Sequence, residues 1–277
     1  MARSLLIGRA FKIVAVSAGC LSVLASSGAS AQTDNVEPLV IPDNVRTALA
    51  AAIDSPVTMP KEKLKKLMMD MVLSGKTTSH EWNIEYLPDG MLGINESSSG
   101  GSSKTSSSRL SLAGLVDPIS SSDASASFGS ASIMAGKAYV PFTIPSGYVT
   151  ASVSSMIELS GQLKESARPG VNAKFEYRYA TVTRRKSQTS GLFGRARESN
   201  PSNSYVVSCF AGIEKPATEL HPALRGSYLP ITCEHKNVKG PQSTQTFAYL
   251  VDSGLYVRAS GVSERFQFEW KVTGAEY

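Results

Sequence analysis

The chain has few of the residues from which metal sites and catalytic groups are usually built. Its 277 residues include only three cysteines and three histidines. So few cysteines exclude a disulfide-dense miniprotein, and an apolar content of 42% excludes a wholly disordered chain. No pair of cysteines has the C-x-x-C spacing of a zinc or redox motif. We therefore expect no metal centre and no other cofactor.

Enzyme signatures are also missing. Ser74-Gly75-Lys76-Thr77 matches the end of a phosphate-binding loop, but Asp70 stands where that motif requires its first glycine. His80-Glu81 begins like a zinc-protease helix, yet Ile84 replaces the second histidine. The sequence contains no G-x-S-x-G elbow. We expect no catalytic residue; the alternative is a hydrolase whose Ser/His pair or carboxylates, with Glu81 and Glu85 as the nearest candidates, meet only in the fold.

Long apolar runs are absent, and the longest segment of this kind lies near the start. Residues 13–25 are apolar, follow Arg3, Arg9 and Lys12, and precede Ala29-Ser30-Ala31. Thirteen residues are too few to span a bilayer, which takes about 20. The pattern predicts a signal peptide over residues 1–31, with Cys20 as the basis of an alternative lipoprotein interpretation. We expect an exported bacterial protein, periplasmic or secreted, with no transmembrane segment in the mature chain.

An excess of one charge is missing once that segment is removed. The whole chain has 28 Lys and Arg against 23 Asp and Glu, and residues 1–31 hold three of the bases and no acid. The mature chain therefore has 25 bases against 23 acids. Basicity of the whole chain thus gives no reason to expect a nucleic-acid partner.

Removal of Cys20 leaves two cysteines, Cys209 and Cys233, both at inward positions of predicted strands. An exported protein meets an oxidising compartment, so the two thiols are expected to form a disulfide. The bond would close a loop of about 25 residues and stabilise the fold by about 3 kcal/mol in the chain-entropy estimate.

Residues 32–95 predict a helical N-terminal unit with a β-hairpin. A first helix is expected over Asn44–Ile53, and a second over Pro60–Leu73 because apolar residues repeat at helical spacing. The members of that apolar stripe are Leu64, Leu67, Met68, Met71 and Val72. Alternation over His80–Leu87, a turn, and Met91–Ile94 predict the hairpin.

Serine dominates the next segment, with 16 serines among residues 97–132. A stretch of this composition has little apolar surface to bury, and it predicts a flexible linker or long loop over residues 96–135.

Residues 136–277 predict a disulfide-stapled antiparallel β domain. Val149–Leu163 alternates for about fifteen residues with the apolar set at odd positions, and several shorter alternating runs follow. Turn signals between them favour an antiparallel β-sandwich or barrel. The fold class is therefore mainly β, α+β overall with the N-terminal unit.

One segment of this domain is basic and apolar at once. A predicted loop of about 20 residues separates the strands ending near Val182 and starting near Tyr205, and loops of this length are often functional. Its bases and apolar residues, the candidate binding site, are Arg184, Arg185, Lys186, Leu192, Phe193, Arg195 and Arg197. The alternative is a solvated hairpin tip without function. We expect a non-catalytic binding or structural component that contacts an envelope protein or an anionic membrane surface through this loop.

Overall fold

The computed structural model describes residues 41–53, 60–88, 90–100, 103–128, 133–135, 138–140, 146–190, 196–238, 240–263 and 266–277. The predicted signal peptide, residues 1–31, and Cys20 lie outside this part of the chain. Residues Asp34–Tyr277 form one compact unit by their internal contacts.

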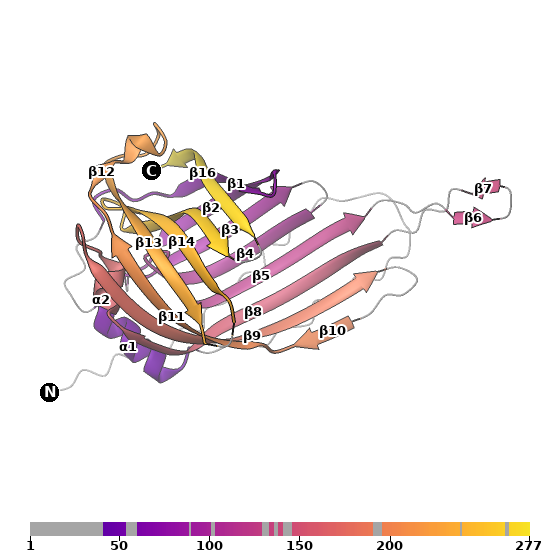
Figure 1. The fold of residues 1–277 in the computed structure, drawn as a ribbon, viewed down its shortest axis with the longest axis horizontal. Coiled ribbons are helices and arrows are strands. Elements are labelled where there is room, and N and C mark those ends of the chain that lie inside the picture. Colours follow the sequence, from indigo (N-terminus) through magenta and orange to yellow (C-terminus); the bar gives the residue numbers. More distant parts are fainter. Residues whose placement is uncertain are drawn as a thin grey trace. The chain divides into compact units, whose positions relative to one another are not determined.

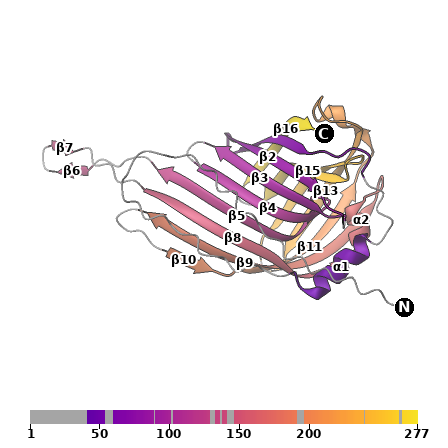
Figure 2. The same cartoon turned by 180° about the vertical axis from the view of Figure 1, so that it is seen from behind.

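Two α-helices and many strands make up the described part (Figures 1 and 2). The helices are α1 (Asp43–Ile53) and α2 (Leu163–Ala167), and a 3-10 turn η1 covers Ala217–Glu219. The strands of the first half are β1 (Lys66–Leu73), β2 (Lys76–Tyr86), β3 (Leu92–Gly100), β4 (Ser103–Leu112), β5 (Val116–Phe128), β6 (Ile133–Ala135), β7 (Ala138–Val140) and β8 (Ser146–Gly161). Those of the second half are β9 (Lys174–Ser190), β10 (Ala196–Ser199), β11 (Ser202–Ala211), β12 (Lys215–Pro216), β13 (Ser227–Asn237), β14 (Gln242–Leu250), β15 (Leu255–Ser263) and β16 (Gln267–Glu276).

The main sheet closes on itself as an antiparallel barrel of 12 strands. Its order runs β9-β11-β13-β14-β15-β16-β1-β2-β3-β4-β5-β8, and pairing of β8 with β9 closes the ring. Closure pairs the two strands that would otherwise be edges of the sheet, β8 and β9, with each other. The expectation of a mainly β, antiparallel fold is confirmed, and of the two predicted architectures the barrel is observed.

Strand registers separate an inner from an outer face, because directly paired residues lie on the same side of a sheet. The inner set includes Trp82, its neighbour Glu96 on β3, and Tyr177 with its neighbour Val207. Trp82, Tyr177 and Val207 are fully buried. The opposite faces of the same strands carry exposed polar side chains such as Asn83, so in this part of the barrel apolar residues face inward and polar residues face outward.

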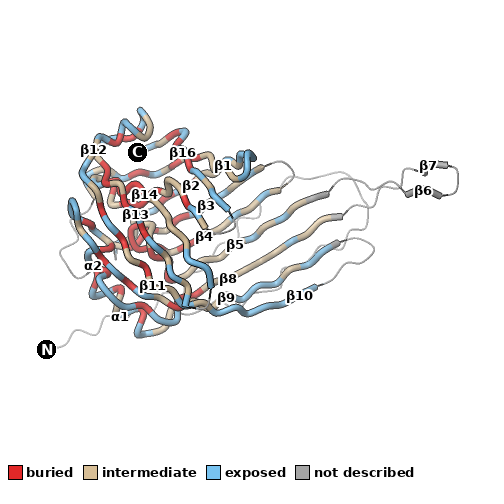
Figure 3. Tube along the Cα trace, in the orientation of Figure 1, coloured by how far each residue is buried: buried red, intermediate tan, exposed pale blue. Residues whose placement is uncertain are grey.

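The two ends of the barrel differ in packing. Buried residues concentrate where α1 and α2 lie, whereas the strands at the other end are half-buried or exposed (Figure 3). At the closed end the β4–β5 turn reaches across to β15, where Tyr256 N–H donates to Ala113 C=O at 2.7 Å. Gly114 in this turn has φ +79°, and an added Cβ there would lie 2.9 Å from Leu255. We call the opposite end, with the turns that follow β1, β3, β9, β13 and β15, the open rim.

The predicted helix over Pro60–Leu73 is wrong, since residues Lys66–Leu73 form β1. Leu67 and Met69 alternate as fully buried residues, and β1 pairs with β16 on one side and β2 on the other. The segment KLMMDMVL is so apolar that its pattern fits a helix and a strand equally well. Pairing with β16 and β2 determines that it forms a strand. The first helix and the hairpin are confirmed, with α1 beginning one residue earlier than predicted.

The predicted serine-rich linker is also wrong within the described residues. The stretch forms the end of β3, all of β4 and all of β5, each paired on both sides. Backbone hydrogen bonds in a barrel do not depend on apolar side chains, and buried anchors such as Arg109, Leu112 and Val116 tie the stretch to the interior. The expected division of the chain at residues 96–135 is therefore absent, because β1–β3 share one sheet with the C-terminal strands.

The long predicted strand is observed as β8, but its apolar set does not face inward throughout. Ser152 and Ser154 lie on the inner face and hydrogen bond to Ser122 and Thr183, both at 2.8 Å. Val149 is consequently exposed. A bulge at Ile157 then shifts the register, so that Met156 and Leu159 are both buried. Near the open rim the inner face of β8 is therefore polar, and the apolar residues that alternate with these serines, such as Val149, lie on the outer face.

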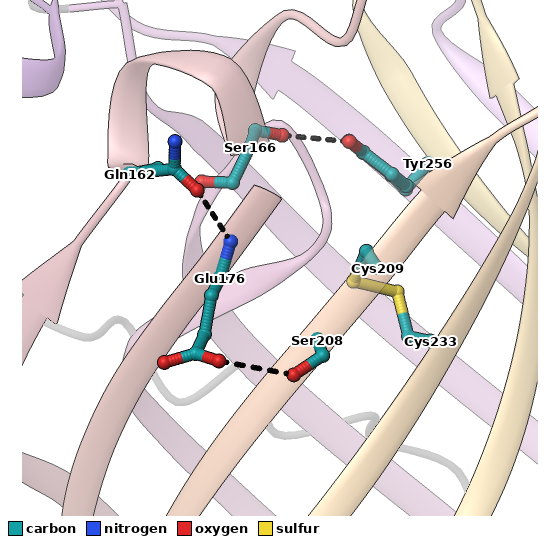
Figure 4. The surroundings of a disulfide bond; sticks show 7 residues. All are labelled: Gln162, Ser166, Glu176, Ser208, Cys209, Cys233 and Tyr256. Atoms are coloured by element: carbon teal, nitrogen blue, oxygen red, sulfur yellow. Dashed lines mark hydrogen bonds between the residues drawn. A yellow bond between two sulfur atoms is a disulfide. The ribbon is translucent and has the colours of Figure 1, made fainter. Parts of the chain in front are cut away.

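The disulfide is confirmed: Cys209 and Cys233 are direct partners on β11 and β13, with a Cα–Cα distance of 4.1 Å (Figure 4). Both cysteines lie on the inner face and are buried. Nearby, Glu176 N–H donates to Gln162 Oε1 and Ser208 Oγ donates to Glu176 Oε2 (Figure 4). The bond joins neighbouring strands and is a structural staple.

Candidate functional site

The predicted basic loop is mostly a strand pair. Arg184, Arg185 and Lys186 belong to β9, and Arg197 belongs to β10, which pairs with β9 beyond the end of β11. All four side chains are exposed. The other predicted site residues, Leu192, Phe193 and Arg195, lie outside the described residues. We call β9 from Arg184 onward, together with β10, the basic hairpin.

The bases of this hairpin do not form one patch, because alternate residues of a strand point to opposite faces. Arg185 pairs with Ser152 and Arg197 with Ser187, which puts both guanidinium groups on the face continuous with the barrel interior. Lys186 lies on the other face and forms an ion pair with Glu198 at 3.6 Å. The sequence pattern therefore identified the residues but not their separation into two sets.

Strand β10 is an edge strand. It pairs with β9 alone among the described strands, and all four of its residues are exposed. Exposed edge strands offer unpaired backbone N–H and C=O groups to another chain. The hairpin thus combines an open edge with two bases on one face.

A second group of charges, which the sequence analysis missed, lies inside the barrel. His80 Nδ1 contacts Glu96 Oε1 at 2.7 Å, and Arg109 Nη1 contacts Glu96 Oε2 at 3.3 Å. Arg109 Nε also approaches Asp117 Oδ2 at 3.7 Å. The side chains of Glu96 and Arg109 are only 12% and 6% exposed. These residues, with Arg258, form what we call the interior ionic cluster.

Aromatic rings frame this cluster. The guanidinium of Arg109 lies 4.4 Å from the centre of Trp82, and that of Arg258 lies 5.7 Å from Trp270. Burial alone would raise the pKa of Glu96, but the hydrogen bond from His80 and the charge of Arg109 outweigh it and lower that pKa. Glu96 is therefore an ionised carboxylate that balances buried positive charge.

The cluster leaves several polar atoms without a hydrogen-bond partner. They are His80 Nε2, Trp82 Nε1, Arg109 Nε and Nη2, Asp117 Oδ1 and Trp270 Nε1, all shielded from solvent. Since these atoms are buried, the cluster is part of the barrel interior. Removing one partner of such a buried ion pair is strongly destabilising, because it leaves a buried charge without compensation.

Hydrolase chemistry finds little support in this arrangement. His80 and Glu96 resemble the base and carboxylate of a triad, but no described serine contacts His80 Nε2. Glu81 and Glu85 lie four residues apart on one strand, which separates their backbones by about 14 Å at 3.4 Å per residue, and the carboxylate of Glu81 pairs with Lys66 at 3.0 Å. Lys66 lowers the pKa of Glu81 by a hydrogen bond, the reverse of what a general acid needs.

The other histidines have structural surroundings. His221 Nδ1 accepts a hydrogen bond from the N–H of Ala223 inside a turn. His235 lies on the inner face opposite Val207, and burial lowers its pKa to about 4. It is therefore neutral at physiological pH. Among the described residues, no group of three His, Cys, Asp or Glu could hold a metal ion.

Comparison with known proteins gives no relative: no family model, no curated protein and no solved structure matches the chain. Within the part of the chain that the structure describes, no helix has both the length and the apolar composition required to cross a membrane.

Proposed function

We propose that this chain is an exported, periplasmic or secreted, non-catalytic binding component of the bacterial cell envelope that contacts its partner through the basic hairpin. The observation that carries the proposal is the exposed edge of β10 beside Arg185 and Arg197 on an otherwise closed barrel. The disulfide supports export, because such bonds persist in oxidising compartments.

The chemistry of the hairpin indicates an extended, acidic partner segment. Strand addition supplies main-chain hydrogen bonds along β10, and side-chain charges then select the partner. Arg185 and Arg197 are diagonal neighbours on one face, within about 8 Å of each other at their backbones. Carboxylates of a bound strand would face both guanidinium groups, which favour such bidentate contacts.

Affinity capture from native envelope tests the proposal, with residues 32–277 as the bait. A second bait carries Arg185→Glu and Arg197→Glu, and a matched control carries Arg178→Glu, an exposed base on the outer face of the same strand. We expect a partner that the wild-type and control baits retain and the double variant loses. Amides of β10 should then exchange more slowly with solvent when the partner is bound.

Equal retention by all three baits would overturn the assignment to the basic hairpin. A partner lost equally from the Arg178→Glu control would indicate a general effect of charge, and it would also count against the proposal. Circular dichroism of each bait verifies that the barrel is folded.

A further inference from the structure

Several turns of the open rim expose apolar side chains. Val238 is 67% exposed, Phe266 51%, Val262 50% and Val72 40%. Val238 lies just after β13, Val262 and Phe266 flank the β15–β16 turn, and Val72 lies near the end of β1. Since β13, β14, β15, β16, β1 and β2 are consecutive in the sheet, these three hairpins are neighbours around the rim. We call these four residues the apolar rim.

Phe266 is held in position rather than loosely exposed. Ser263 N–H donates to Phe266 C=O at 2.9 Å, and Phe266 N–H donates to Ser263 Oγ at 3.3 Å. Its ring stacks on that of Phe268 with the centres 6.1 Å apart. Phe268 in turn fills the space that Gly261 leaves, since a Cβ there would lie 2.2 Å from Phe268 Cζ. An aromatic ring that is fixed before binding loses little entropy on insertion into a partner.

The charge beside the apolar rim is mainly positive. The strand residues at the rim are the two at the rim end of each barrel strand and the four of β10, which lies beyond the end of β11. Among these described residues the bases are Lys76, Lys104, Arg197 and Lys236, and the one acid is Glu198. Some bases near the rim have acidic neighbours, since Lys236 lies 4.0 Å from Glu234 and Lys186 lies 3.6 Å from Glu198. The residues at the strand ends nevertheless carry a net positive charge. Apolar tips with flanking bases match the chemistry of an anionic bilayer surface.

We propose that the apolar rim docks peripherally on an anionic lipid bilayer. Phe266 and the three valines enter the headgroup region, while Lys76 and Lys236 contact lipid phosphates. The four apolar residues and the two tested bases, Lys76 and Lys236, lie on or next to strands other than β9 and β10, so the inference does not depend on the proposed function.

Sedimentation with lipid vesicles tests the proposal. Residues 32–277 are used, because the apolar segment at residues 13–25 would bind vesicles by itself. We expect binding to vesicles that contain phosphatidylglycerol, and little binding to phosphatidylcholine alone. One base near an anionic surface contributes about fivefold in partitioning, so Lys76→Ser with Lys236→Ser should reduce binding by about 25-fold. Phe266→Ser should reduce it by about tenfold.

Matched controls lie at the closed end. Ile213 and Val171 are 61% and 51% exposed, and Ile213→Ser and Val171→Ser should leave vesicle binding unchanged. The proposal is overturned if the wild-type chain does not bind phosphatidylglycerol vesicles. It is equally overturned if the control variants lose as much binding as Phe266→Ser, or if the rim variants change capture of an envelope protein and leave vesicle binding intact.

Discussion

Glu96→Gln is the substitution that tests the interior ionic cluster most directly. The change keeps the size of the side chain and removes the one carboxylate among the described residues that contacts both His80 and Arg109. Within the described part of the chain, Asp117, at 3.7 Å, would then be the one carboxylate left beside the Arg109 guanidinium, which is 6% exposed. Removing one partner of a buried ion pair costs about 3 to 5 kcal/mol. Because Asp117 remains, we expect a loss near the lower limit, about 3 kcal/mol in the free energy of unfolding.

Urea denaturation followed by tryptophan fluorescence measures this loss. The chain has two tryptophans, Trp82 and Trp270, and both contact the cluster, so their emission reports on it. In thermal unfolding, about 3 kcal/mol corresponds to a decrease of about 6 to 12 °C in Tm for a domain of this size. Glu81→Gln is the control. Glu81 follows His80 in β2 but lies on the outer face, and it forms an ion pair with Lys66 in which both side chains are partly exposed to solvent.

A loss below about 1 kcal/mol for Glu96→Gln would refute the reasoning, because it would equal that of an exposed pair. The same conclusion would follow if Glu81→Gln were as destabilising as Glu96→Gln. An equal effect would show that the free energy does not depend on burial of the charges inside the barrel.

Three further predictions concern stability. Burial lowers the pKa of His235 to about 4, whereas the value in the unfolded chain is near 6.5, so the unfolded chain binds an extra proton as the pH falls between these values. The free energy of unfolding should therefore drop by about 2 kcal/mol from pH 6.5 to 5. The urea midpoint of His235→Leu should lack this pH dependence. Gly261→Ala should cost about 1 to 3 kcal/mol by its clash with Phe268, and adding Phe268→Ala should relieve part of the strain. Replacing Cys209 and Cys233 by alanine should cost about 3 kcal/mol with an unchanged circular dichroism spectrum, and an altered spectrum would contradict the staple role.

Elements with strict alternation and clear turn residues were predictable from the sequence. Alternation of apolar and polar residues predicts the hairpin around Trp82 and the strand β8. The expectation of export to an oxidising compartment predicts the disulfide between Cys209 and Cys233. By contrast, β1 was not predictable, because Leu67 and Met69 in a uniformly apolar segment fit a helix and a strand alike. Only its two long-range partners, β16 and β2, decide between them.

The candidate sites show the same limit. Arg185 and Arg197 could be singled out by composition, but their common face follows from a register that composition does not contain. Glu96 and Arg109 are 13 residues apart and face each other because β3 pairs with β4. Because the serine-rich composition predicts a linker there, the sequence does not predict the pairing of β3 with β4 that brings the two charges together.

Amide hydrogen exchange separates the two interpretations of the serine-rich stretch. A linker would exchange at the rate of an unfolded chain, whereas β4 has hydrogen-bonded neighbours on both sides and should be protected. We expect protection of the Ser103–Leu112 amides to approach that of β13, a central strand beside the disulfide. Fast exchange throughout β4 with full protection of β13 would mean that this side of the barrel is open in solution. Protection that rises from Ser103 towards Leu112 would agree with the structure, because the buried anchors lie at that end of the strand.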